Sequence, residues 1–192
     1  MPTLTLLLAA LLAYQPASSN LRRVFEDNLA RQRREFGDAD PRTAQASRDL
    51  ALFLLNDGDR AAARRALTDV LKLDESALGP TAPQTLEDAA ALAGLSPAAQ
   101  AEPLYRRAAE SPDASVAGPA LSSLAASRKA AGDLADAAAL YRRALEKAQS
   151  LEGRKGPVVT LLVRTLAATL RQAGRASEAA ALERQYPVSA GR

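Results

Sequence analysis

Three adjacent carboxylate pairs are the side chains of this chain whose types and spacing come nearest to catalytic chemistry. They are Glu26-Asp27, Asp74-Glu75 and Glu87-Asp88. General acid–base catalysis needs two carboxyl groups in different environments, because burial or charge must separate their pKa values. Each of these pairs stands among basic residues or beside a turn. We therefore expect all three to be solvated surface residues or helix caps.

No other combination typical of a catalytic or metal site occurs. The chain has no histidine and no cysteine, which excludes Ser-His-Asp and Cys-His nucleophiles, the commonest metal ligands, and disulfides. It also contains no Gly-x-Gly-x-x-Gly and no phosphate-binding Gly-Lys-Ser/Thr loop. We therefore predict a protein that is not an enzyme and that uses no cofactor and no metal.

Composition favours an all-α protein. Alanine and leucine dominate the 192 residues, aromatic residues make up only 4%, and no stretch alternates with the period of a strand. The 25 Lys and Arg residues exceed the 22 Asp and Glu residues by a net charge of only +3. A surplus this small does not require a polyanionic partner.

The clearest element is a pair of helices predicted from Pro119 to Ser150. Apolar residues recur at a 3.6-residue period on both sides of Gly132-Asp133, which interrupts the pattern. Neither amphipathic helix can bury its apolar stripe alone. The two helices must therefore pack on each other and on neighbours of the same kind.

The same hairpin recurs along the chain. The turns Gly58-Asp59 and Gly174-Arg175 correspond to Gly132-Asp133, and the connector Glu35–Thr43 returns 42 residues later as Ala77–Thr85. Self-similarity at such a period is typical of a helical solenoid.

This pattern resembles the tetratricopeptide repeat (TPR), and within it the longer, kinesin-light-chain-like variety. Leu78–Thr85 resembles the connector Leu-Gly-Pro-x-x-Pro-x-Thr, while Glu102–Ala108 and Tyr141–Leu145 resemble the second helix of the repeat. The resemblance covers residues 20–185. It implies an all-α, TPR-type α-solenoid of antiparallel helical hairpins in a right-handed superhelix, from a bacterium-like cell.

The chain accordingly divides into a leader, a half repeat and four hairpins. The predicted parts are a signal peptide at 1–19, a half repeat with its connector at 20–40, hairpins at about 41–82, 83–114, 115–156 and 157–186, and a disordered tail at 187–192.

The leader has the shape of a secretory signal peptide. Leu4–Ala13 is apolar apart from Thr5, and the small residues Ala17 and Ser19 precede a cut ahead of Asn20. No Lys or Arg stands near Met1, and the stretch is shorter than the roughly 20 apolar residues that span a bilayer. We predict export to the periplasm or the medium. The alternatives are a retained anchor, or an uncleaved helix that caps the first repeat of a cytoplasmic protein.

The resemblance also assigns structural roles to small and aromatic residues. The turn glycines, the alanines where two helices touch most closely and the tyrosines at the bulky packing position are Gly58, Gly132, Gly174, Ala63, Ala101, Ala137, Ala179, Tyr105 and Tyr141.

In this family the first helix of each repeat lines the concave side, where peptides or partner helices are held. The resemblance places these ten residues there: Gln45, Arg48, Leu52, Asn56, Ser122, Ala126, Lys129, Arg164, Ala168 and Arg171. Four of the ten are basic, which predicts an acidic or carboxylate-bearing protein or peptide as ligand. A merely soluble polar groove is the alternative. The paired asparagines frequent in kinesin-light-chain-like repeats are absent.

The leading interpretation is a non-enzymatic protein- or peptide-binding repeat module. One alternative is a structural or assembly component that forms homo-oligomers through its uncapped C-terminal repeat. Another is an RNA-binding helical repeat. The low aromatic content and the leader argue against RNA.

Overall fold

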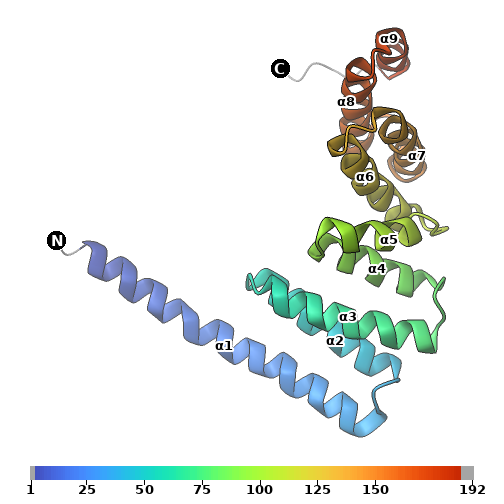
Figure 1. The fold of residues 1–192 in the computed structure, drawn as a ribbon. Coiled ribbons are helices and arrows are strands. Elements are labelled where there is room, and N and C mark those ends of the chain that lie inside the picture. The colour runs from blue at the N-terminus through green and yellow to red at the C-terminus, as the bar shows by residue number, and fades with distance from the viewer. Residues whose placement is uncertain (1–2, 187–192) are drawn as a thin grey trace. The chain divides into compact units, whose positions relative to one another are not determined.

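The computed structural model describes the backbone of residues 3–186 and the side chains of residues 19–186. Within that part the chain forms nine α-helices and no strand (Figure 1). The predicted all-α class is therefore confirmed. The predicted tail at 187–192 and the side chains of the predicted leader before Ser19 lie outside the described residues. Among the described residues, no helix combines the length and apolarity needed to cross a membrane.

The chain divides into two compact units, Met1–Leu95 and Ser96–Arg192, here called unit 1 and unit 2. The division falls inside the predicted second hairpin at 83–114. The assignment of four hairpins therefore stays a prediction, and each unit is described by itself.

Unit 1 contains four helices that pack in chain order. They are α1 (Thr3–Phe36), α2 (Pro41–Asn56), α3 (Arg60–Ala77) and α4 (Pro83–Leu95). The core is built by Leu29 of α1, Leu50 and Leu54 of α2, and Ala63 of α3. The rings of Phe25 and Phe53 stack beside it with their centroids 5.1 Å apart, so α1 is held by residues of its C-terminal half.

Unit 2 contains five helices. They are α5 (Ala98–Ala108), α6 (Ala114–Ala130), α7 (Leu134–Glu152), α8 (Pro157–Gln172) and α9 (Ala176–Gln185). The helix α7 packs on both α6 and α8, α5 packs on α6, and α9 packs on α8. Leu121, Val163 and Leu166 are completely buried in its core. The apolar stripe predicted for α6 therefore faces inward, and α8 buries an equivalent stripe.

The helix α6 begins before Pro119, where the sequence predicted its start. Asp113 caps it, and its carboxylate accepts a hydrogen bond of 2.8 Å from the backbone N–H of Ser115. An N-cap carboxylate satisfies one of the free N–H groups of a first turn. Pro119 consequently lies inside the helix, with an exposed side chain.

The three turn glycines occupy equivalent bends between antiparallel helices. Gly58, Gly132 and Gly174 have φ angles of 87°, 86° and 74°. Residues with a Cβ rarely adopt this conformation. After the first turn, Asp59 accepts a hydrogen bond of 2.9 Å from the backbone N–H of Ala62 and so begins α3.

The residues expected at close contacts are buried to different degrees. Ala63, Ala137 and Ala179 are 0% exposed, and Ala101 is 7% exposed. Tyr141 is buried, which raises the pKa of its phenol, whereas Tyr105 is only half-buried.

The α2–α3 hairpin of unit 1 corresponds to the α6–α7 hairpin of unit 2 without a gap, 74 residues further on. Corresponding positions include Gly58 and Gly132 in the turn, and Leu71 and Leu145 in the core. The correspondence allows the two hairpins to be compared residue by residue.

Candidate functional site

The helices α6 and α8 present equivalent faces to solvent. They correspond at a spacing of 42 residues, and buried Leu121 of α6 corresponds to buried Val163 of α8. The predicted binding positions therefore form two matching rows. The pairs are Ser122 with Arg164, Ala126 with Ala168, and Lys129 with Arg171. Ala126, Arg164, Ala168 and Arg171 are exposed, and Ser122 and Lys129 are half-buried. We call these six residues the α6–α8 face.

Neither α6 nor α8 contains an acidic residue. Together they carry four basic side chains, which are Arg128, Lys129, Arg164 and Arg171. The acidic residues of unit 2 lie on α5, α7 and α9 and in the connections between helices. Acidic residues are thus excluded from α6 and α8, whereas α5, α7 and α9 carry both signs of charge, and the α6–α8 face carries positive charge.

The same face has exposed apolar groups beside its cations. On α8 the side chains of Val158 and Leu161 are 45% and 63% exposed. Arg164 follows Leu161 one helical turn later and makes no ion pair or hydrogen bond with a described side chain. An aliphatic patch next to a cation that has no partner among the described side chains can bind a ligand with both apolar and anionic groups.

Arg171, at the C-terminal end of this face, is engaged by a neighbouring helix. Its guanidinium lies 2.5 Å from a carboxylate oxygen of Glu183 on α9. The hydrogen bond with Glu183 raises the pKa of Arg171 and lowers the pKa of the Glu183 carboxyl. Both side chains are about half exposed, and such surface pairs are weak. A ligand carboxylate can therefore replace Glu183 at little cost.

The predicted binding residues of unit 1 behave differently. Gln45, Leu52 and Asn56 are exposed on α2, with Leu52 60% exposed. The amide of Gln45 donates a hydrogen bond of 2.8 Å to Asp49. Arg48, in contrast, has a side chain only 14% exposed, so its charge is not offered to a ligand.

Arg48 is bound inside unit 1 by two carboxylates. Its Nε lies 3.0 Å from one oxygen of Asp88 on α4, its Nη2 lies 3.2 Å from the other, and Nη2 also donates to Asp74 on α3. We call these three residues the triad. The side chains of Asp74 and Asp88 are each 4% exposed. The expectation that these two acids are solvated or act as caps is therefore wrong.

The helical period explains why Asp74 is buried. It lies on the same stripe as Leu67, Val70 and Leu71, which are all buried. The sequence carried this signal, but an acidic residue at the end of an apolar stripe is easily assigned to the surface. Burial, followed by the Asp74 carboxylate, raises the pKa of Asp88 to about 6, although Arg48 opposes the shift.

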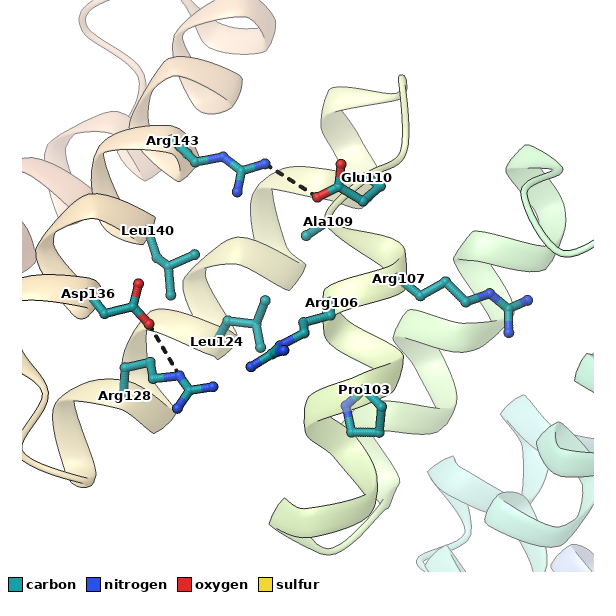
Figure 2. A pocket seen from close by; sticks show the side chains of 10 residues that line it. All are labelled: Pro103, Arg106, Arg107, Ala109, Glu110, Leu124, Arg128, Asp136, Leu140 and Arg143. Atoms are coloured by element: carbon teal, nitrogen blue, oxygen red, sulfur yellow. Dashed lines mark ion pairs between the residues drawn. The ribbon is translucent and has the colours of Figure 1, made fainter.

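Elsewhere in unit 2, a groove of about 660 Å³ lies between α5, α6 and α7 (Figure 2). Pro103, Leu124 and Leu140 give it an apolar lining. Arg107 points away from the other lining side chains in Figure 2. The groove is large enough to accept an apolar side chain.

The charges of this groove are largely satisfied within unit 2. The three other arginines that line it, Arg106, Arg128 and Arg143, are all paired with carboxylates. Arg106 and Arg128 share Glu102, Arg128 lies 3.3 Å from Asp136, and Arg143 lies 3.6 Å from Glu110. Three arginines thus meet three acids, and the groove offers a ligand less net charge than the α6–α8 face.

No group of three His, Cys, Asp or Glu side chains able to hold a metal ion occurs among the described residues.

Solved TPR-like structures share this fold at low sequence identity. Two crystal structures of a Podosopora anserina putative kinesin light chain with nearly identical TPR-like repeats match 91% of this chain and 87% of theirs, at 19% identity and TM-scores of 0.67 and 0.66. BtubC (BKLC) from P. vanneervenii matches 91% of this chain and 74% of its own, at 19% identity and a TM-score of 0.74. No family model and no curated protein matches the chain in sequence.

These likenesses define the class of the fold. The chain is an all-α repeat solenoid of the TPR-like kind seen in kinesin light chain repeats, which confirms the resemblance drawn from Leu78–Thr85 and the turn glycines. A fold of this class is consistent with a protein-binding repeat module.

Proposed function

We propose that this protein is a non-enzymatic binding module that holds an acidic peptide segment of a partner protein on the α6–α8 face. The observation that carries the proposal is the absence of any acidic residue from α6 and α8, combined with the three basic residues of the α6–α8 face, Lys129, Arg164 and Arg171. A cationic surface without internal carboxylates attracts anionic segments, and charge-assisted hydrogen bonds then fix them.

The apolar groups on α8 add a requirement for the ligand. Leu161 and Val158 are exposed next to Arg164, so a segment with one or two aliphatic or aromatic side chains among its acids fits best. Burial of such a side chain supplies affinity, and the charges supply orientation.

Charge reversal tests this proposal. The probes are fluorescein-labelled peptides in which Asp and Glu flank Leu or Phe, compared with peptides in which Lys and Arg replace the acids. We expect only the acidic peptides to bind, with an affinity that falls as salt rises. The double variant Lys129→Glu/Arg164→Glu should bind at least about tenfold more weakly, equal to about 1.4 kcal/mol.

Arg184→Glu is the matched control for the single variant Arg164→Glu, because Arg184 is exposed on α9, outside this face. Both single variants change the net charge of unit 2 by the same amount, and Arg184→Glu should leave binding almost unchanged. Equal loss in these two single variants would mean that only net charge matters. Undiminished binding by the double variant, or binding of no acidic peptide, would remove the α6–α8 face as the site.

We further propose that Met1–Ser19 is a cleaved export signal. Its apolar stretch and the small residues Ala17 and Ser19 support this. Phe25 and Leu29, through which α1 packs in unit 1, both follow Asn20. Cleavage before Asn20 would therefore leave that packing in place.

N-terminal sequencing of the chain recovered from the periplasm or medium of a bacterial host tests the export proposal. We expect the sequence to begin at Asn20. A secreted chain that begins at Met1, or a chain retained in the cytoplasm, would contradict it.

A further inference from the structure

The triad of unit 1 has one buried cation for two buried acids. Arg48 comes from α2, Asp74 from α3 and Asp88 from α4, and the three side chains are 14%, 4% and 4% exposed. With both acids ionised, the cluster carries one surplus negative charge away from water. Uncompensated buried charge is costly, and a single proton between the two carboxylates removes it.

We infer that the triad is a proton-binding lock that ties α4 to the α2–α3 hairpin, strong while one proton is bound and weaker once that proton is lost. The site is independent of the proposed peptide-binding function, because all its residues lie in unit 1.

The lock acts on α4 because the charged groups that face Asp88 come from the two preceding helices. Arg48 on α2 and Asp74 on α3 are those groups. The neutral amide of Gln45 accepts a long hydrogen bond of 3.4 Å from Arg48. Other attachments of α4 include the buried side chains of its apolar face and a hydrogen bond of 3.1 Å from Arg60 to the carbonyl of Gly94, and neither of these depends on the titration of a carboxyl group.

The direction of the pH effect follows from the environment of Asp88. Burial, together with Asp74, raises the pKa of Asp88 from an ordinary 3.8 to about 6. A group whose pKa is raised on folding stabilises the folded state fully below its unfolded pKa, and this contribution is lost as pH rises through the folded pKa. The lock is therefore strong near pH 4 and weak above about pH 6.

Solvent can reach the site through a small cavity. A space of about 280 Å³ is lined by Gln45, Arg48, Asp74 and, from α4, Gln84. Water in this space could exchange the proton without unfolding unit 1.

The corresponding positions of unit 2 carry no such group. Seventy-four residues after Arg48, Asp74 and Asp88 stand Ser122, Ala148 and Leu162, of which Ala148 and Leu162 are buried. The three positions that the triad occupies can thus be filled by side chains that do not ionise. This comparison supplies a test variant whose replacements already occur in this fold.

Carboxyl NMR titration of the full chain tests the proton site. We expect one Asp carboxyl of the wild type to titrate with a midpoint near pH 6. That signal should be missing in Asp88→Asn and in the triple variant Arg48→Ser/Asp74→Ala/Asp88→Leu. A high midpoint that survives in Asp88→Asn, or no Asp midpoint above about 5, would overturn the inference.

Hydrogen exchange tests the lock itself. After correction for intrinsic exchange, the opening of α4 in the wild type should increase about tenfold or more between pH 5 and pH 7, since each unit of pKa shift corresponds to a factor of ten. The triple variant should show no such increase. Opening of α4 that is independent of pH in the wild type, or equally dependent in both chains, would refute the lock.

Discussion

Unit 1 and unit 2 use arginine in opposite ways. In unit 1, Arg48 is enclosed by Asp74 and Asp88 where three helices meet. In unit 2 the corresponding positions are occupied by Ser122, Ala148 and Leu162. The basic side chains of α6 and α8 are partly or fully exposed, and neither helix contains an acidic residue. The two hairpins correspond without a gap, yet they differ in where their basic side chains lie. In unit 1 the basic side chain of Arg48 is enclosed in an ion cluster, whereas in unit 2 those of α6 and α8 face solvent.

The difference shows that repeat geometry alone does not determine where binding occurs. A cation satisfied by two buried acids contributes to packing and specificity, but it is not available to a partner. A cation such as Arg164, without an acidic neighbour on its own helix, remains available. On this basis we propose that unit 2 carries the binding face and that unit 1 has a pH-sensitive interior.

The largest effect should follow from breaking the triad at its cation. Arg48→Ala leaves Asp74 and Asp88 buried without a counter-charge, so we expect unfolding at pH 7 to become easier by about 3–5 kcal/mol. Urea denaturation followed by circular dichroism measures this. Ser122→Ala, the corresponding change in unit 2, should alter stability by less than about 0.5 kcal/mol. Equal effects of the two changes would remove the contrast between the units.

Replacing the whole triad should have a smaller effect, of opposite sign. In Arg48→Ser/Asp74→Ala/Asp88→Leu no charge is left unpaired, and apolar replacements of buried ion clusters are often neutral or stabilising by about 1–4 kcal/mol. Urea titrations at pH 5 and pH 7 should show the larger gain at pH 7. A triple variant as unstable as Arg48→Ala would mean that the triad contributes net stability.

The smallest effects should come from the turns, where the units are alike. Gly58→Ala and Gly132→Ala should each cost about 1 kcal/mol, because both φ angles are positive. Gly118→Ala is the control. It lies inside α6, where a new Cβ would meet Lys147 at an ordinary 3.5 Å, and it should gain about 0.5–1 kcal/mol. Thermal unfolding of the variants distinguishes these outcomes.

Much of the fold could be predicted from the sequence because turns and apolar stripes are local signals. Gly58, Gly132 and Gly174 mark the bends, and the stripe of α6 faces the core as expected. The predicted start of α6 at Pro119 is too late, because Asp113 is the N-cap and Pro119 lies inside the helix.

The triad could not be derived in the same way. Asp74 and Asp88 lie beside Glu75 and Glu87. In a sequence, two adjacent acidic residues are typical of the solvent-exposed surface. Only the packing of α2, α3 and α4 brings both acids to Arg48. Two hints stand in the sequence, namely the apolar stripe of α3 on which Asp74 lies and the 74-residue correspondence with Ala148 and Leu162. Of the predicted binding cations, this packing removes Arg48 and leaves Lys129, Arg164 and Arg171.

The gapless correspondence of the α2–α3 and α6–α7 hairpins has a practical consequence for protein engineering. The turn glycine, the aspartate cap and the following connector glycine recur at the same spacing in both hairpins. They are Gly58, Asp59 and Gly79 in the first hairpin and Gly132, Asp133 and Gly153 in the second. The two hairpins are therefore segments of equal length. Chimaeric chains in which one segment is copied over the other would exchange side chains without inserting or deleting a residue.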